Sequence, residues 1–384
     1  MTVLDAVRGL GIEVPSWAYG NSGTRFKVFA QPGVPRDPYE KLADAAQVHR
    51  FTGAAPSVSL HIPWDAVADY ADLAKHAADL GVRIGTVNAN VFQDDDYRLG
   101  SVTNPDPRVR RKATDHLLDC VDVMDATGSR DLKLWFADGL NYPGQDDLAA
   151  RQDRLAAALR EVYERLGDDQ RMVLEYKLFE PAFYATDVPD WGTAYAHCLA
   201  LGPKARVVVD TGHHAPGTNI ELIVAFLLRA DRLGAFDLNS RFYADDDLMA
   251  GAADPFQLFR ILHEVNVGGG FDPARNVALM LDQCHNIEPK IPGQIRSILN
   301  VQEAAAKALL VDRDALRAAQ ESGDVLGANG VLMDAFATDV RPLLAGLREE
   351  LGLDPDPMRA YAASGYAERI AAERVGGAQA GWGA

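Results

Sequence analysis

Acidic side chains recur at the ends of short apolar segments of this 384-residue chain. Glu175 closes the run MVLE, Asp210 closes VVVD, Asp237 lies in GAFDLN, and Asp282 follows VALML. If these segments are parallel strands of one barrel, their carboxyl ends meet at one mouth, where barrel enzymes place their chemistry. Carboxylates that converge in a partly dry pocket need a compensating cation. An oxygen-rich ligand set predicts Mn²⁺ or Mg²⁺.

A second group of candidate ligands lies close to the first. His213 comes three residues after Asp210, and Asp245 and Asp247 belong to the segment RFYADDDLM that follows Asp237. One imidazole with several carboxylates suits Mn²⁺ or Co²⁺. If Asp210 serves both groups, the result is a two-metal site.

Polar and aromatic side chains near the same strand ends complete a candidate pocket. Lys177 shares a strand face with Glu175, because strand residues two apart point the same way. A lysine in a strand buried on both faces is rare, although Glu175 could be its structural ion-pair partner. His61, Trp64 and Trp135 could each be ordinary core residues. Their coincidence with the acidic residues at the same strand ends favours a functional site over a structural explanation.

The elements that must position these residues alternate along the chain. Amphipathic helical patterns at residues 107–126, 147–166, 193–201 and 219–230 separate the short apolar runs. Such alternation predicts a (β/α)8 TIM barrel, with a doubly wound sheet as the alternative. No GxGxxG motif follows any of the runs. The predicted strands span residues 57–62, 83–87, 131–136, 172–177, 206–210, 234–239 and 277–282, with an eighth near 298–301.

Three segments describe the predicted organisation. Residues 1–50 form an N-terminal extension, 51–305 the catalytic barrel, and 306–384 a C-terminal helical extension suited to oligomer contacts. The last ten residues, VGGAQAGWGA, are rich in glycine and alanine and are expected to be loose.

Composition restricts the partners and the compartment. A formal charge of −17 disfavours binding to nucleic acid. Three scattered cysteines (Cys120, Cys198 and Cys284) argue against a disulfide framework and favour a cytoplasmic protein. The sequence contains no apolar run long enough to cross a membrane.

Several long motifs resemble those of the L-rhamnose isomerases, particularly the bacterial branch with broad substrate tolerance. The resemblance extends from about residue 17 to about residue 344 and is carried by LKLWFADGLNYPGQDD, MVLEYKLFEPAFYATDVPDWG, VVVDTGHHAPGTNIE, NSRFYADDDL and MLDQCHN. That family is related in fold and metal site to the xylose isomerases.

The resemblance implies a role for each matching residue. Lys177 would lie near substrate O1, and Phe26 would enter the pocket of a neighbouring subunit, which implies a homotetramer. Glu175, Asp210 and Asp282 would bind a structural metal, and Asp210, His213, Asp245 and Asp247 a catalytic metal. The sugar would be lined by Trp17, His61, Trp64 and Trp135. Asp237 departs from the family pattern, which usually has histidine there, so the first set becomes all-carboxylate.

The implied activity is a metal-dependent aldose–ketose isomerisation, most naturally L-rhamnose to L-rhamnulose by a metal-assisted 1,2-hydride shift. Lys177, Asp282 and His213 would be catalytic, with two divalent ions per subunit, Mn²⁺ before Co²⁺ or Mg²⁺. Interconversion of D-allose and D-allulose is an alternative. Three rivals remain: a two-metal hydrolase, an epimerase that deprotonates its substrate, and a non-catalytic sugar-binding homologue.

Overall fold

A computed structural model describes residues 2–24, 26–181 and 183–375 of the chain. All but the first residue of the glycine- and alanine-rich tail therefore lies outside the described residues. Within them, no helix is both long and apolar enough to cross a membrane.

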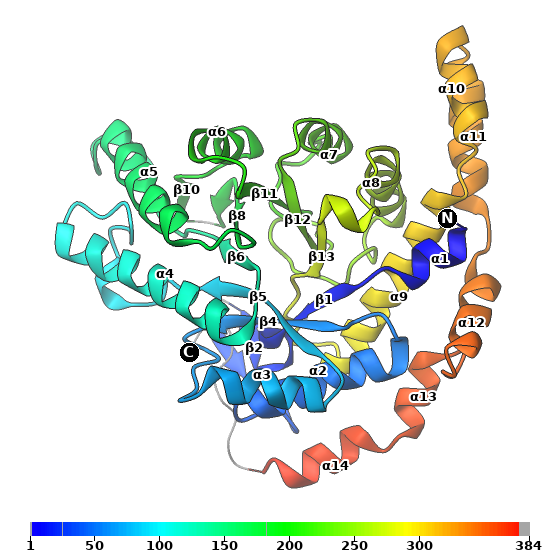
Figure 1. The fold of residues 1–384 in the computed structure, drawn as a ribbon, viewed down its shortest axis with the longest axis horizontal. Helices are drawn as coiled ribbons and strands as arrows, with labels where there is room; N and C mark the ends of the chain where they lie inside the picture. Colours follow the sequence, from blue (N-terminus) through cyan, green and yellow to red (C-terminus); the bar gives the residue numbers. More distant parts are fainter. Residues whose placement is uncertain (1, 25, 182, 376–384) are drawn as a thin grey trace.

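Eight parallel strands close into a barrel, which confirms the predicted (β/α)8 fold (Figure 1). Around the barrel the strands run in the order β1, β13, β12, β11, β8, β6, β5 and β4. Their inner and outer faces are both covered, so they are apolar almost throughout. The strands are β1 (Ile12–Pro15), β4 (Ser57–Ile62), β5 (Arg83–Ala89), β6 (Asp131–Leu134), β8 (Arg171–Glu175), β11 (Ala205–Asp210), β12 (Leu233–Leu238) and β13 (Ala278–Leu281).

A ring of helices surrounds the barrel, with one helix following each barrel strand (Figure 1). Aspartates cap several of them; Asp37, Asp106 and Asp254 each precede a proline at the helix start. Part of the acidic excess therefore serves helix capping. The ring consists of α2 (Pro38–Thr52), α3 (Tyr70–Asp79), α4 (Pro107–Thr127), α5 (Leu148–Arg165), α6 (Trp191–Leu201), α7 (Ile220–Arg229), α8 (Pro255–Val267) and α9 (Lys290–Leu309).

The eighth strand is not where the sequence pattern put it. Residues 298–301 lie inside α9, where Ile291, Ile295 and Ile298 are buried at helical spacing. A short apolar run does not distinguish a strand from a buried helix turn. The missing strand is β1, which pairs with β13 and β4. A barrel strand thus lies within residues 1–50, the segment expected to precede the barrel. β1 was not recognised in the sequence because Glu13 and Pro15 interrupt its apolar pattern.

The C-terminal segment is helical and runs along one side of the barrel. The helices α10 and α11 pack against each other and project beyond the ring (Figure 1). Their use in oligomer contacts stays a prediction. Outside the barrel ring, the chain forms α1 (Val3–Arg8), α10 (Arg313–Ser322), α11 (Val325–Ala337), α12 (Arg341–Glu350), α13 (Pro357–Ala363) and α14 (Tyr366–Glu373).

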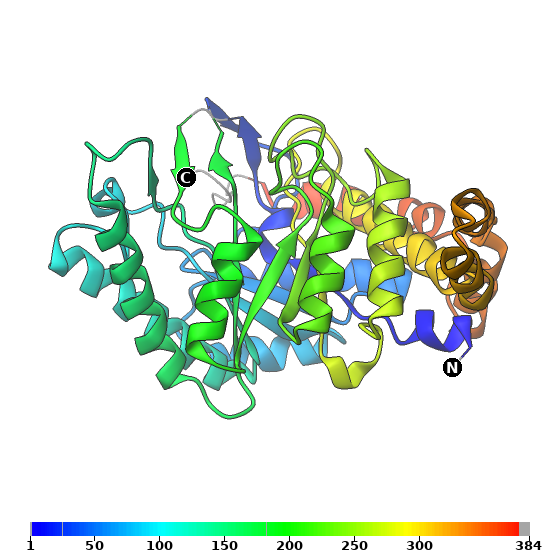
Figure 2. The same cartoon turned by 90° about the horizontal axis from the view of Figure 1, so that it is seen from above.

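Two small sheets lie on the same side of the barrel (Figure 2). One is the hairpin of β2 (Ser22–Thr24) and β3 (Lys27–Phe29). The other joins β7 (Gly139–Leu140), β10 (Tyr184–Thr186) and β9 (Phe179–Glu180). Because β9 and β10 follow the carboxyl end of β8, this is the side on which the candidate site lies.

Candidate active site

The carboxylates form one layer of the barrel interior. A small apolar cluster lies below it, and each of its members precedes an acidic residue by two positions, so the two share a strand direction. Oxygen atoms of the four acidic residues lie within 4.8 Å of one another, as the strand-end pattern predicted. The pairs are Val173 with Glu175, Val208 with Asp210, Ala235 with Asp237, and Met280 with Asp282.

His213 joins part of this layer to the loop after β12. Its Nδ1 donates to the Tyr176 carbonyl oxygen at 3.1 Å, which leaves Nε2 as the free ring nitrogen. That Nε2 lies 3.1 Å from Asp245 Oδ1 and 4.0 Å from Asp210 Oδ2. A backbone hydrogen bond on one nitrogen is the usual way to orient a metal-binding imidazole. Glu175, Asp210 and His213 form the second group of potential metal ligands.

The donor set fits a divalent cation. Asp237 Oδ1 is buried and accepts no hydrogen bond from the described residues, while the buried Glu175 Oε1 and Asp245 Oδ1 each lie 3.1 Å from a ring nitrogen of His213. Such atoms are costly to bury unless a cation or water satisfies them. The 3.1 Å between His213 Nε2 and Asp245 Oδ1 also suits two ligands of one ion, which are about 3.0 Å apart when they bind at right angles.

Burial and mutual repulsion shift the titration of the acidic residues. Burial, reinforced by Glu175 and Asp245, raises the pKa of Asp210 to about 7 despite the nearby His213. Burial and the neighbouring Asp245 also raise the pKa of Asp247 well above its ordinary value. For His213, the attraction of Asp210 and Asp245 outweighs burial and raises the pKa. A bound cation would relieve this excess of negative charge.

Lys177 faces the pocket from the segment that follows β8. Its backbone N–H donates to Val188 O at 3.0 Å, and Nζ donates to Asp245 Oδ2 at 2.7 Å and Glu180 Oε2 at 2.9 Å. The ammonium also lies 5.0 Å from the centre of the Trp135 ring. Burial opposes the charged form, but Asp245 and Glu180 raise the pKa of Lys177, so it remains an ammonium.

These groups line one pocket of about 420 Å³. Its aromatic wall contains His61 stacked on Trp64 at 4.0 Å and Trp17 edge-on to His61 at 5.3 Å. Asp210 and Asp237 lie buried beneath it. Phe26, on the β2–β3 hairpin, is 82% exposed and does not line its own chain's pocket. The predicted residues that do line the pocket are Trp17, His61, Trp64, Trp135, Glu175, Lys177, His213, Asp245, Asp247 and Asp282.

Comparison with known proteins matches residues 43–285 to the model of the xylose isomerase-like TIM barrel. The chain belongs to this family. It is 44% identical to a probable sugar isomerase of Rhizobium meliloti (strain 1021), over 99% of this chain and 91% of that protein. It is 42% identical to a probable sugar isomerase of Mesorhizobium japonicum, over 97% and 88% of the two chains. The predicted class, an enzyme of the isomerase and epimerase kind, is therefore confirmed.

Solved structures of two sugar epimerases have the same barrel fold. An L-ribulose 3-epimerase superposes with a TM-score of 0.59 at 16% identity, covering 79% of this chain and 98% of its own. A D-psicose 3-epimerase from Clostridium cellulolyticum H10 gives 0.53 at 13% identity, with 78% and 97% covered. Identities this low support the barrel architecture alone.

Sequence reasoning missed several residues that line the pocket of this isomerase-family barrel. The most consequential is Lys133 on β6, which meets the carboxylate layer. It sits in the apolar run LKLW, so the argument that singled out Lys177 applied to it equally. The other missed residues carried no periodic signal because they lie in loops or on the short strands β9 and β10, as with Phe92, Gln93, Glu180, Phe183 and Tyr184.

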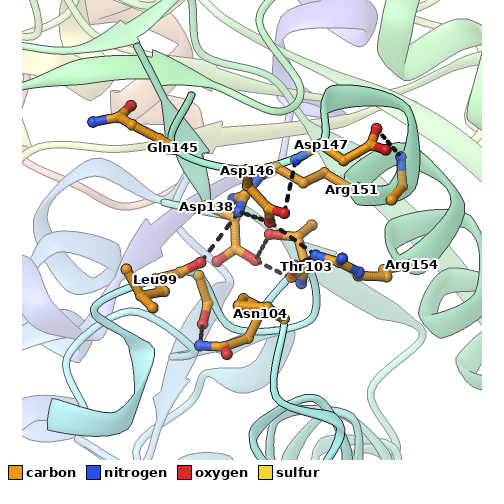
Figure 3. A network of polar contacts seen from close by, with 12 residues as sticks. Leu99, Thr103, Asn104, Asp138, Gln145, Asp146, Asp147, Arg151 and Arg154 are labelled. Atoms are coloured by element: carbon orange, nitrogen blue, oxygen red, sulfur yellow. Dashed lines mark hydrogen bonds and ion pairs between the residues drawn. The ribbon is translucent and has the colours of Figure 1, made fainter. Parts of the chain in front are cut away.

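A buried polar network holds the loops behind one pocket wall (Figure 3). Asp138 accepts hydrogen bonds from the backbone and hydroxyl groups of Ser101 and Thr103, at 2.7 to 3.0 Å. Arg151, 2% exposed, forms a bidentate pair with Asp187 and also donates to Leu99 O. The segments after β5, β6 and β10 are therefore fixed to α5, next to the segment after β8 that carries Lys177, whose backbone N–H donates to Val188 O.

Proposed function

We propose that the chain is a metal-dependent aldose–ketose isomerase with L-rhamnose as its principal substrate, as its resemblance to the L-rhamnose isomerases implies. The observation that carries the proposal is that Lys177 and His213 meet at Asp245 in one pocket. Lys177 Nζ lies 2.7 Å from Asp245 Oδ2, and His213 Nε2 lies 3.1 Å from Asp245 Oδ1. A cationic donor beside a potential Lewis-acid site matches the need to stabilise charge on two adjacent sugar oxygens.

The reaction moves a hydride from C2 to C1 and a proton from O2 to O1. Lys177 is the donor available to O1, because its ammonium is held at a fixed place by Asp245 and Glu180. Asp247 and Asp282 line the same pocket and are acceptors available for the O2 proton. A bound divalent cation supplies Lewis-acid polarisation of the substrate oxygens.

The candidate ligands form two sets that share Glu175 and Asp210. Each set is a candidate place for one of the expected ions, Mn²⁺, Co²⁺ or Mg²⁺. His213 with the carboxylates would hold a divalent ion in one position. The other position is all-carboxylate, and Lys133 borders it.

The aromatic wall bears on the choice of sugar. Trp64, Phe92 and Trp135 present an edge-to-face arrangement in which Phe92 lies 6.0 Å from Trp64 and 5.0 Å from Trp135. Burying the methyl group of a 6-deoxy sugar there would contribute about 1 kcal/mol. Discrimination of that size is weak, so D-allose and D-allulose are proposed as further substrates. Phe26 of a neighbouring subunit would complete the wall in the proposed homotetramer.

The decisive experiment uses chelated enzyme supplied with Mn²⁺, Co²⁺ or Mg²⁺ and measures ketose formed from L-rhamnose and D-allose. Metal-restored L-rhamnulose supports both the reaction and its cation dependence. A higher rate on D-allose than on L-rhamnose would make D-allose the principal substrate. No ketose from either sugar with any of the metals would overturn the proposal.

Running the reaction in D₂O separates isomerisation by hydride shift from deprotonation. A hydride shift keeps the C2 hydrogen within the sugar, so the product should carry no deuterium at C1. Deuterium at C1 would indicate that the hydrogen moves as a proton that exchanges with solvent, and not as a hydride. Deuterium at C3 of a ketose substrate would instead favour an epimerase.

A further inference from the structure

Lys133 is the one lysine that contacts the carboxylate layer among the described residues. Its Nζ lies 2.6 Å from Asp237 Oδ2 and 3.7 Å from both Glu175 Oε2 and Asp282 Oδ2. The lysine side chain is 5% exposed, and those of Asp237 and Glu175 are 0% and 2% exposed. The Trp17 ring lies 5.5 Å from the ammonium.

The fold fixes the ammonium in this place. Lys133 lies on β6, next to Asn88 of β5 and Val173 of β8, and points into the barrel one layer above the apolar cluster. The ammonium donates a hydrogen bond to Asp237 Oδ2, and the carboxylates of Glu175 and Asp282 lie within ion-pair distance of it.

A divalent ion bound by the four carboxylates of this layer would lie close to the positive charge of the Lys133 ammonium. Three of the four carboxylates that could hold the ion already pair with Nζ, and the oxygens of the set span at most 4.8 Å. Two cations so close in a buried site repel each other strongly. In the second set, Lys177 Nζ pairs with one member, Asp245, at 2.7 Å, and no lysine or arginine lies within 4.0 Å of Asp210 among the described residues.

We propose that the Lys133 ammonium is the resident cation of the set formed by Glu175, Asp210, Asp237 and Asp282. The subunit then binds a single divalent ion, through Glu175, Asp210, His213 and Asp245. This inference rests on the proposed metal dependence of the enzyme and refines only the number and place of the ions. Asp237 Oδ1 has no donor, so removing the ammonium would open a second ion site.

The test is the number of Mn²⁺ ions bound by folded, chelated protein, measured by equilibrium dialysis with metal analysis and by electron paramagnetic resonance. The natural protein should bind one Mn²⁺ per subunit with an isolated-ion spectrum. Lys133→Met should bind two and show the spectrum of a spin-coupled pair. The double variant Lys133→Met/Asp237→Asn, which removes the buried pair together, should return to one.

Lys41→Met is the matched control, because Lys41 and Asp65 form another fully buried pair at 2.6 Å; it should still bind one ion. If Lys133→Met folds only with Mn²⁺ present, the ions are counted after refolding in Mn²⁺, and two per subunit are again expected. Two ions in the natural protein, or one in Lys133→Met, would overturn the inference. Neither result alters the aldose assay, whereas absence of ketose would overturn the proposed function and leave the ion count unaffected.

Discussion

At the scale of single residues, Lys177 is the group whose removal should affect the chemical step most. Replacing it with methionine keeps much of its length and its packing on Trp135 but removes the donor to O1. We expect kcat to fall on the order of 10²–10³-fold, by analogy with the loss of an oxyanion donor. The measurement is initial ketose formation at saturating aldose and metal.

Lys204→Met is a suitable control, because Lys204 also covers an aromatic ring, that of Tyr163 at 5.1 Å, but lies at the amino end of β11. It should leave kcat unchanged. An equal loss of activity in both variants would assign the effect on Lys177 to general destabilisation.

Asp210 gives the site its expected pH dependence. Burial raises its pKa to about 7, above the value of about 3.9 for an unfolded chain. In chelated protein, stability from this group is therefore present at low pH and is lost as the pH rises from about 4 to about 7. Binding a cation requires ionised Asp210 and neutral His213, so metal affinity should rise at least about tenfold per pH unit below 7, and loss of the His213 proton should extend the rise above pH 7.

Calorimetric titration with Mn²⁺ between pH 5.5 and 8 measures this dependence. In the acidic part of the range, the heat should vary with the ionisation enthalpy of the buffer, because a proton leaves as the metal binds. An affinity that stays constant across the range would show that Asp210 is already ionised.

At the scale of elements, α5 should matter through Arg151. Removing its guanidinium leaves Asp187 without its buried partner, which lies at 2.7 Å, whereas Asp146 keeps Arg154 at 2.9 Å. Breaking a buried pair in this way costs about 3–5 kcal/mol. Arg151→Met should lower the free energy of unfolding by roughly that amount, measured by urea denaturation.

Arg160→Met on the exposed side of the same helix is the comparison, and its free energy of unfolding should change little. Because Asp187 is followed by Val188, whose carbonyl oxygen accepts from the backbone N–H of Lys177, kcat should fall in Arg151→Met even under conditions where the protein is fully folded. Unchanged stability in Arg151→Met would mean that water replaces the buried arginine at little cost.

At the scale of the whole molecule, the cation should act as a stabilising ligand. Its candidate ligands come from β8, β11 and the loops after β11 and β12, so binding connects separate βα units. At a concentration 100 times its dissociation constant, a ligand specific for the folded state contributes about 2.7 kcal/mol. Thermal unfolding of chelated protein should therefore shift upward by several degrees when Mn²⁺ is added.

Asp245→Asn should reduce that upward shift, because it removes one charged candidate ligand while keeping the loop's length and polarity. An unchanged melting temperature on adding Mn²⁺ to the natural protein would mean that the cation does not bind the folded state.

The sequence by itself determined the seven strands with clear apolar runs. For the four of them associated with Glu175, Asp210, Asp237 and Asp282, it also determined which face carries the acidic residue. Strand alternation is local, so the positions of Glu175, Asp210 and Asp237 at the mouth follow from it. In the other acidic run, residues 94–96, Asp94 caps a short 3-10 helix and pairs with Lys112. Asp245 and Asp247 instead line the pocket.

Only the tertiary structure decided which residues meet across the barrel. Closure by β1 and the contact of Lys133 with Asp237 depend on the stagger between strands that are far apart in sequence. No local period encodes that stagger, because it results from the packing of all eight strands. The same packing brings Phe92 and Glu180 to the pocket from separate βα units. Composition and spacing therefore identified the acidic residues that meet at the mouth, and the closed barrel determined which side chains they contact and the balance of charge around them.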